Sequence, residues 1–401
     1  MREIQVSRGT NAARTPSAAR SQFALWNLGF RPFYLLASVF AASSMLVWTA
    51  QFSGWLPAAP VRGPVGHGHE MLFGFTIAVV AGFLLTAVRN WTGQPTPTGA
   101  SLMGLAALWL AGRLLALTPA ALPAAIASAA FPIAIAVAIA LPLLRAGNAR
   151  NYFFIGLLSM LALLGAAVQI ALLVEAPWSP RLALQLGLDV VLFVMAVMGG
   201  RVIPMFTNNG VTGTDARRHP LLEKLALGSV LALFAADAMG LGGAALALLA
   251  SFAAAAHSLR LALWQPWRTL RTPLVWILHA GYAWLVLHLW LRGLSAAGLV
   301  AESFAMHALT VGAIGSLTIG MMVRTARGHT GRMLRADRFE TACFVLIQLA
   351  ALMRVAAPIA VPSLYLAGVQ AAGVLWSCAF ALYAIRYWPV LTRPRTDGQP
   401  G

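Results

Sequence analysis

The chain has 401 residues, of which 60% are hydrophobic and 10% are charged, and its mean hydropathy is +0.77. This composition excludes a soluble globular domain, in which about 25% of the residues are charged. The net charge of +17 would suit a nucleic-acid partner, but the charges are distributed as in a membrane protein, so no nucleic acid is expected.

Apolar runs long enough to cross a bilayer, about 20 residues as a helix, recur along the whole chain. They predict an all-α, polytopic bundle of about twelve transmembrane helices, with both termini cytoplasmic. The least distinct divisions are Thr118–Pro123 and Gly240–Gly243. The predicted spans lie near residues 33–50, 69–88, 100–117, 121–144, 152–174, 182–203, 221–240, 243–264, 274–292, 301–323, 339–357 and 363–386.

The basic residues support this topology. If the N-terminus lies inside, 23 of the 28 lysines and arginines fall on the cytoplasmic side and five on the outer side. Such a bias is the positive-inside rule. We therefore expect a single transmembrane domain over residues 29–388, a disordered basic cytoplasmic tail over 1–28 and a C-terminal tail over 389–401.

The N-terminal tail and the cysteines exclude several classes. The first 22 residues hold four arginines but no apolar core before a cleavage site, so they are not a signal peptide. The two cysteines, Cys343 and Cys378, fall inside predicted spans, and no C-x-x-C-H motif occurs. Covalently attached haem, iron–sulfur clusters and a disulfide framework are therefore not expected.

An ionisable cluster begins the second predicted span. His67, His69 and Glu70 stand where a polar loop becomes a hydrophobic helix. Ionisable groups near hydrocarbon are costly unless they are paired or bind a metal, so they are functional candidates. His307, on the tenth span, lies about 9 Å below the outer surface by helix rise. These residues form a predicted outer cluster, to which His288 and Glu302 are close in depth.

A second group of histidines lies near the cytoplasmic side. His257 and His279, on consecutive antiparallel spans, both lie about 9–10 Å from that surface. His329 stands in an inner loop, and His219 lies in another inner loop as a solvated residue. Imidazole is a natural ligand of copper and haem iron, and histidines at two shared depths suggest metal binding. The alternative for any one of them is a hydrogen bond to a neighbouring helix.

Two arginines at outer span ends, Arg113 and Arg354, are candidates to pair with haem propionates, because arginine binds carboxylates in a bidentate manner. The alternative is that they snorkel to the headgroups. Asp189 and Asp237, inside spans, either relay protons or pair with arginines.

Several segments together resemble the NnrS family, over about residues 28–340. The resemblance rests on Gly29–Tyr34 (GFRPFY), His67–Phe75 (HGHEMLFGF), Gly82–Gly93 (GFLLTAVRNWTG), Leu110–Leu114 (LAGRL), Gly200–Phe206 (GRVIPMF), Leu278–Trp284 (LHAGYAW), His307–Gly315 (HALTVGAIG) and Arg327–Arg332 (RGHTGR). Gly66 departs from the pattern, since a tryptophan is common there, and His288 has no counterpart.

The resemblance implies a bacterial inner-membrane protein that binds haem and copper and is associated with denitrification and with protection against nitric oxide. By position it implies site roles for His67, His69, Glu70, His307 and His329. We expect non-covalent b-type haem and copper as cofactors.

Nitric oxide is small, neutral and soluble in lipid, so it reaches a membrane-embedded metal without a pore. The two depths favour two sites, with His67, His69, His307 and Glu70 holding one metal near the outer face. His257 and His279, helped by His329, would hold the other near the cytoplasmic face, and which of the two is haem and which is copper stays open. Arg113 and Arg354 are the candidate propionate partners, and a variant places both metals together. The expected partners are the lipid bilayer, nitric oxide or nitrosylated molecules, and an electron donor. A twelve-helix secondary transporter and a haem-based sensor or electron-transfer subunit remain alternatives.

Overall fold

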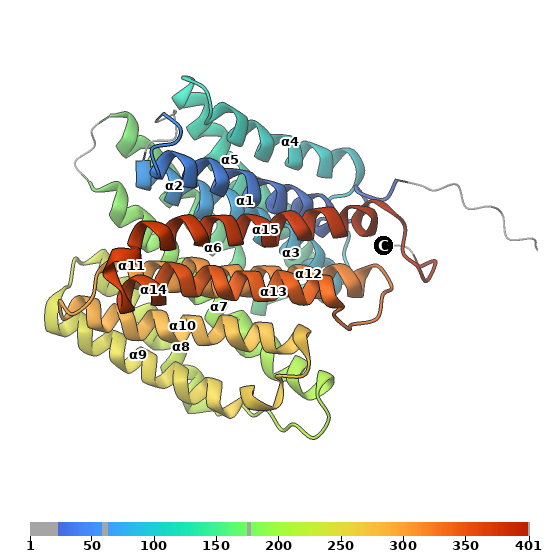
Figure 1. Ribbon diagram of the computed structural model, residues 1–401. Coiled ribbons are helices and arrows are strands. Elements are labelled where there is room, and N and C mark those ends of the chain that lie inside the picture. Colours follow the sequence, from blue (N-terminus) through green and yellow to red (C-terminus); the bar gives the residue numbers. More distant parts are fainter. Residues whose placement is uncertain (1–22, 58–62, 175–177, 400–401) are drawn as a thin grey trace, which may run out of the picture.

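The computed structural model describes residues 23–57, 63–174 and 178–399. Within these ranges the regular structure is helical, with no strand, and the helices run back and forth as one bundle (Figure 1). The predicted all-α class is therefore confirmed. Residues 1–22, most of the predicted N-terminal tail, lie outside the described residues, as does Arg62.

The first half of the bundle is built from long helices joined by short turns. One of them is a continuous run in which two α-helical parts flank a π-helical segment. The helices are α1 (Phe30–Phe52), α2 (Gly63–His69) continuing through η1 (Glu70–Thr76) into α3 (Ile77–Thr92), α4 (Gly99–Leu115), α5 (Ala121–Arg145), η2 (Ala149–Asn151), α6 (Phe153–Leu173) and α7 (Pro180–Gly210).

The second half repeats this up-and-down arrangement, and two of its runs also contain π-helical segments. The helices are α8 (Pro220–Ala238), α9 (Gly243–Leu263), η3 (Pro266–Arg268), α10 (Pro273–Ala296), α11 (Glu302–His307) continuing through η4 (Ala308–Ile314) into α12 (Gly315–His329), α13 (Arg338–Ala351) continuing through η5 (Leu352–Ala356) into α14 (Ala357–Ala360), η6 (Pro362–Leu364) and α15 (Tyr365–Thr392).

Ten helical runs in the described chain are long and apolar enough to cross a bilayer, which makes this a polytopic membrane protein. Two helices are not among the ten. α4 has only 17 residues, and α8 carries three charged residues, Glu223, Lys224 and Asp237. The prediction of twelve spans, which includes both, remains a prediction.

The two described ends of the chain meet at one end of the bundle. The backbone N–H of Ala24 donates to the carbonyl of Thr392 at 2.8 Å. We call this the terminal end, on the right in Figure 1, and the opposite one the far end. At the far end Gly240 and Gly243 adopt positive φ angles of 68° and 59° and close the turn between α8 and α9. This confirms one of the two least distinct divisions in the sequence.

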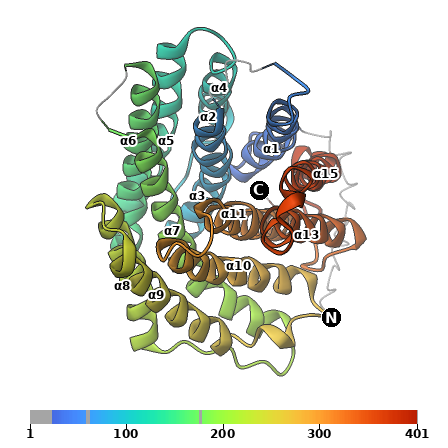
Figure 2. The same ribbon diagram turned by 60° about the vertical axis from the view of Figure 1, so that its left-hand side comes forward.

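Three helical runs form the centre of the bundle. The runs Gly63–Thr92, Pro273–Ala296 and Glu302–His329 are the most deeply buried of the ten, and Figure 2 shows α10 and α11 within the ring of the other helices. Two of these runs contain π-helical segments, η1 and η4. A π-helical turn adds a residue to the helix and is frequent at functional sites.

Gly200 on α7 makes room for the guanidinium group of Arg260, which pairs with Glu223. A Cβ atom at position 200 would overlap that group. We expect Gly200→Ala to lower the free energy of unfolding by about 1–3 kcal/mol, as overpacking does, in a denaturation experiment in detergent. Gly228→Ala on α8 is the control, because nothing lies within 4 Å of a Cβ atom there; equal losses in both variants would refute this account.

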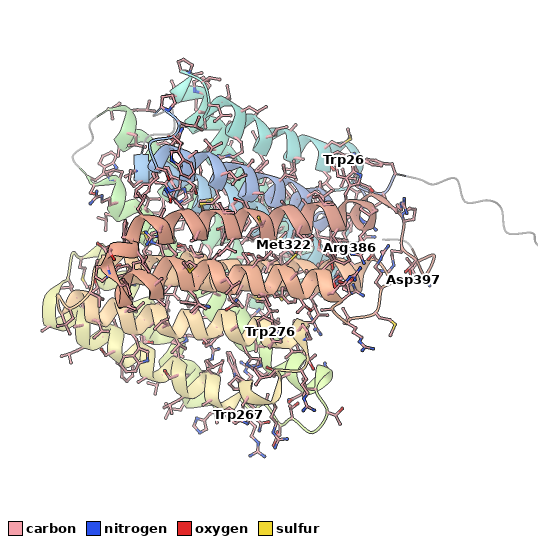
Figure 3. All side chains as sticks on the ribbon, in the orientation of Figure 1. Trp26, Trp267, Trp276, Met322, Arg386 and Asp397 are labelled. Atoms are coloured by element: carbon pink, nitrogen blue, oxygen red, sulfur yellow. The ribbon has the colours of Figure 1, made fainter. Side chains whose placement is uncertain are left out.

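Asp337 caps α13 at the terminal end, where Figure 3 labels its partner Arg386. Its carboxylate accepts hydrogen bonds from the backbone N–H groups of Phe339 at 2.8 Å and Glu340 at 3.3 Å, and from Arg386 at 2.8 Å. Partial burial acts to raise the pKa of Asp337, but interactions with Glu340 and Arg386 outweigh it and hold the pKa below the ordinary 3.8. The ionised cap therefore stabilises α13 at neutral pH and is lost as the pH falls below 3.8 toward the lowered pKa.

Asp337→Ala is expected to cost the start of α13 about 1 kcal/mol, so that its first amides exchange with solvent about fivefold faster at neutral pH. Hydrogen-exchange mass spectrometry measures this. Asp337→Ser keeps a capping oxygen and should restore most of the protection. Unchanged exchange in Asp337→Ala would show that the cap does not hold the helix end.

Candidate metal site

A cavity of about 380 Å³ lies toward the far end of the bundle, between α1, the π-helical segments and α15. We call it the histidine cavity, because His67 and His307 both line it. The sulfur-bearing side chains of Met71 and Met306 and the guanidinium group of Arg354 line it as well. The structure thus brings together His67 and His307, two members of the predicted outer cluster, and adds Arg354.

The hydrogen bonding of His307 fixes which ring nitrogen is available. Its Nδ1 lies 2.6 Å from the carbonyl oxygen of Ser303, one turn earlier in α11. A carbonyl only accepts, so Nδ1 carries the proton and Nε2 keeps its lone pair. Within the described chain Nε2 has no hydrogen-bond partner, and a ring held in this way is oriented as a metal-ligating imidazole is.

His67 approaches the same cavity from the end of α2. Its ring stacks on the indole of Trp48 on α1, with ring centroids 4.6 Å apart and planes inclined by 6°. The aromatic side chains of Phe75, Tyr365 and Trp376 add to the cavity wall. The role of Trp48 could not be predicted from the sequence, because the contact joins two helices that are separate in the chain.

His69 does not line the histidine cavity. Its Nδ1 donates to Glu70 at 3.0 Å, and Glu70 also accepts from Arg113 at 2.6 Å. Arg113 donates in addition to Ser128 on α5 at 2.6 Å. The buried Nε2 of His69 has no partner in the described chain. These hydrogen bonds connect α2, η1, α4 and α5. Arg113, one of the two arginines predicted to pair with haem propionates, is therefore already paired within the protein.

Arg354, the other predicted arginine, contacts Tyr365 but forms no ion pair within the described chain. It lies in η5, is 7% exposed and has a buried Nη1 atom without a partner in the described chain. Its guanidinium carbon lies 5.4 Å from the ring centroid of Tyr365. A buried guanidinium group without a carboxylate is costly, so its position in the cavity wall favours an anionic ligand group.

Each π-helical segment lies at this cavity. η1 begins directly after His69, η4 begins directly after His307, and η5 contains Arg354. The extra residue in a π-helical turn changes the direction of the side chains beyond it. Three π-helical segments lie around this one cavity. Because such segments are frequent at functional sites, they indicate that the histidine cavity is one.

The inner histidines bind to protein partners. His257 donates from Nε2 to the carbonyl of Ala226 at 3.0 Å and accepts at Nδ1 from Tyr282 at 2.6 Å, so both ring nitrogens are occupied. His279 contacts the hydroxyl of Thr207 at 2.8 Å through Nε2, and its buried Nδ1 has no partner in the described chain. These bonds match the alternative of a hydrogen bond to a neighbouring helix.

His329 lies elsewhere, at the last residue of α12. Its Nε2 is 3.5 Å from the side-chain amide of Asn90, and its ring lies 5.7 Å from that of Phe30. It lines a second cavity, of about 640 Å³, which we call the terminal cavity. The histidines predicted for the inner site therefore have separate surroundings.

The residues of the histidine cavity fit haem or a single copper ion. In the described chain no three His, Cys, Asp or Glu side chains gather into a metal-binding group. Haem would be held by the imidazoles of His67 and His307, and the guanidinium group of Arg354 suits a propionate. Copper would combine the imidazoles with the thioether of Met71 or Met306, which soft copper accepts.

The fold and this cavity define the class: a polytopic helical membrane protein with a histidine-lined cavity near one end of its bundle. Within that class the chain belongs to the NnrS family, since the family model described as NnrS protein matches residues 24–395. The match confirms the resemblance noted in the sequence and extends it through α13 and α15. Comparison with curated proteins finds no match.

Proposed function

We propose that the protein binds nitric oxide, or small nitrosylated molecules, at a redox-active metal in the histidine cavity, as part of a bacterial response to nitrosative stress linked to denitrification. The observation that carries this proposal is the pair of imidazoles in one cavity, with the Nε2 lone pair of His307 free and its Nδ1 proton held by Ser303. The cofactors proposed are b-type haem and copper.

Haem is the better match for the cavity. His307 would ligate the iron through Nε2, His67 would face it from α2, and Arg354 would hold a propionate. When bound, haem iron or copper would supply a redox-active centre with affinity for nitric oxide. The stack with Trp48 keeps the ring of His67 in place, and aromatic and aliphatic side chains form much of the cavity wall. Nitric oxide, being neutral, enters through the apolar helices without a charged path.

The topology proposed with this function has twelve spans, with the terminal end in the cytoplasm of a bacterial inner membrane. This topology counts the short helix α4 and the charged helix α8 as spans, in addition to the ten long apolar runs. The excess of lysine and arginine at the terminal end supports this orientation. The histidine cavity then lies in the outer half of the bilayer, within reach of periplasmic nitric oxide.

An optical spectrum and metal analysis of the full chain, purified in detergent, test the function. We expect about one haem or copper per chain and a spectrum that shifts when nitric oxide is added. Turnover of nitric oxide with an electron donor would show an enzyme, and binding without turnover a sensor or carrier. A colourless, metal-free protein from cells supplied with haem and copper would refute the proposal.

A secondary transporter is the second candidate, and the two cavities favour it. They lie toward opposite ends of the bundle, and on the run Glu302–His329 their nearest lining residues are Ile314 and Met321, about 10 Å of helix rise apart. A closed segment between two such cavities is what alternating access requires. Uptake of a solute into vesicles by metal-free protein would support this candidate.

A further inference from the structure

The terminal cavity is a separate space that the proposed function does not use. It lies between α3, α7, α12 and the connection from α5 to α6. Its volume of about 640 Å³ is within the range of about 300–1,000 Å³ for small-molecule sites. One part of its wall is apolar, with Phe83, Trp91 and Met198, and the other part is polar.

The polar part of the wall is positively charged. Arg150, Arg201 and Arg324 line the cavity together with His329, and no aspartate or glutamate is among its lining residues. Arg201 also lies within electrostatic range of Arg150. Like charges around one space repel each other unless an anion lies between them.

These arginines differ from three buried arginines of the bundle. Arg113, Arg260 and Arg292 each pair with a carboxylate. Arg201 and Arg324 form no ion pair within the described chain, although both are partly buried. No carboxylate within the described chain compensates the charge of Arg201 and Arg324, so this charge is available to a ligand.

Both guanidinium groups are held in place. The guanidinium carbon of Arg324 lies 3.6 Å from the ring centroid of Phe206 on α7. Arg201 donates to the side-chain oxygen of Asn151 at 2.8 Å, and Asn151 donates to that of Asn148 at 3.0 Å. Because neighbouring side chains fix them, little conformational entropy is lost when they bind an anion.

We propose that the terminal cavity binds an anion whose phosphate or carboxylate group lies between Arg201 and Arg324, with Arg150 at the exposed side. The apolar part of such a ligand packs against Phe83 and Trp91. The same chemistry is offered by two sources, a soluble phosphate compound and the headgroup of an anionic lipid, and the experiment separates them. The inference is independent of the metal in the histidine cavity.

The test uses the full chain in a nonionic detergent and follows the midpoint of thermal unfolding. Inorganic phosphate is titrated against sodium chloride of equal ionic strength, and phosphatidic acid in mixed micelles against phosphatidylcholine. Bound ligand raises the midpoint, and the concentration dependence gives a dissociation constant. We expect saturable stabilisation by phosphate, by phosphatidic acid, or by both, and the pattern identifies the source.

Arg201→Gln and Arg324→Gln are each expected to weaken this binding by about 10- to 100-fold, because each removes a charge-assisted hydrogen bond. Arg145→Gln is the matched control, since Arg145 is exposed in the last turn of α5 at the same end and does not line the cavity. Should a glutamine variant not fold, Arg324→Lys is used, because it keeps the charge. Its affinity for the anion is expected to lie between that of the wild-type protein and that expected for the glutamine variants.

Three results would overturn the inference. The first is no stabilisation of the wild-type protein beyond the salt and phosphatidylcholine controls. The second is equal weakening in Arg145→Gln. The third is loss of the metal's optical spectrum in Arg201→Gln and Arg324→Gln with unchanged anion binding, which would make the cavity a cofactor site instead.

Discussion

Replacing His307 with alanine is expected to lower the affinity of the protein for its metal by more than about 100-fold. Removal of a group that only orients a ligand costs about 10- to 100-fold, and His307 offers the free Nε2 atom itself. Metal content per folded chain and the optical spectrum, both measured after size-exclusion chromatography, give the result.

Two other histidines serve as controls for this experiment. His219→Ala changes an exposed residue before α8 and should leave metal content and stability unchanged. His257→Gln breaks the bonds to Tyr282 and Ala226, so it should lower stability but keep the metal. Equal metal loss in His257→Gln and His307→Ala would contradict the assignment of the site to the histidine cavity.

Replacing Arg292 with alanine should cost about 3–5 kcal/mol, since it leaves two buried carboxylates without a cation. Arg292 on α10 donates to Asp189 on α7 at 2.8 Å and also pairs with Asp237 on α8. The free energy of unfolding in detergent, from denaturant titration, measures this cost.

The surface pair of Arg217 with Asp215 provides the comparison, because both side chains are largely exposed and screened by solvent. Arg217→Ala should therefore leave the stability unchanged within error. A triple variant, Arg292→Met with Asp189→Asn and Asp237→Asn, removes all three charges and should recover most of the loss. A loss below about 1 kcal/mol in Arg292→Ala would show that the cluster is solvated.

Most of the fold follows from the sequence, because hydropathy and turn residues act locally. The runs predicted at 121–144 and 243–264 became α5 and α9 with boundaries shifted by a residue or less. The division predicted at Gly240–Gly243 separates α8 from α9, whereas the span predicted to end at 203 continues through Pro204 to Gly210 in α7. The π-helical segments were not predicted, since a π-turn depends on tertiary contacts and leaves the hydropathy of the run unchanged.

The site was only partly predictable. The depth argument correctly placed His67 and His307 at one level, and the cavity contains both. It did not separate His67 from His69, although residues two apart on a helix do not face the same neighbour. That rule indicates that His69 points toward a different helix, and the side-chain amide of Gln169 on α6 lies 3.4 Å from its Nδ1.

The roles of the arginines and aspartates required the structure. Arg113 and Arg354 look alike in the sequence, yet one is paired with Glu70 and the other is not. Of the two alternatives for Asp189 and Asp237, pairing with an arginine is the one observed, and their partner is Arg292. Hydropathy indicates how deep in the membrane a residue lies. It does not indicate which neighbouring helix the side chain faces, because the sequence alone does not reveal how the helices pack.

X-ray absorption spectroscopy of the metal-loaded protein tests the central claim most directly, because it reports the atoms around the metal. The account predicts scattering from imidazole carbons of His67 and His307, which falls in His307→Ala while the His219→Ala spectrum is unchanged. A metal with no imidazole scattering, or one whose surroundings are identical in His307→Ala, would contradict it.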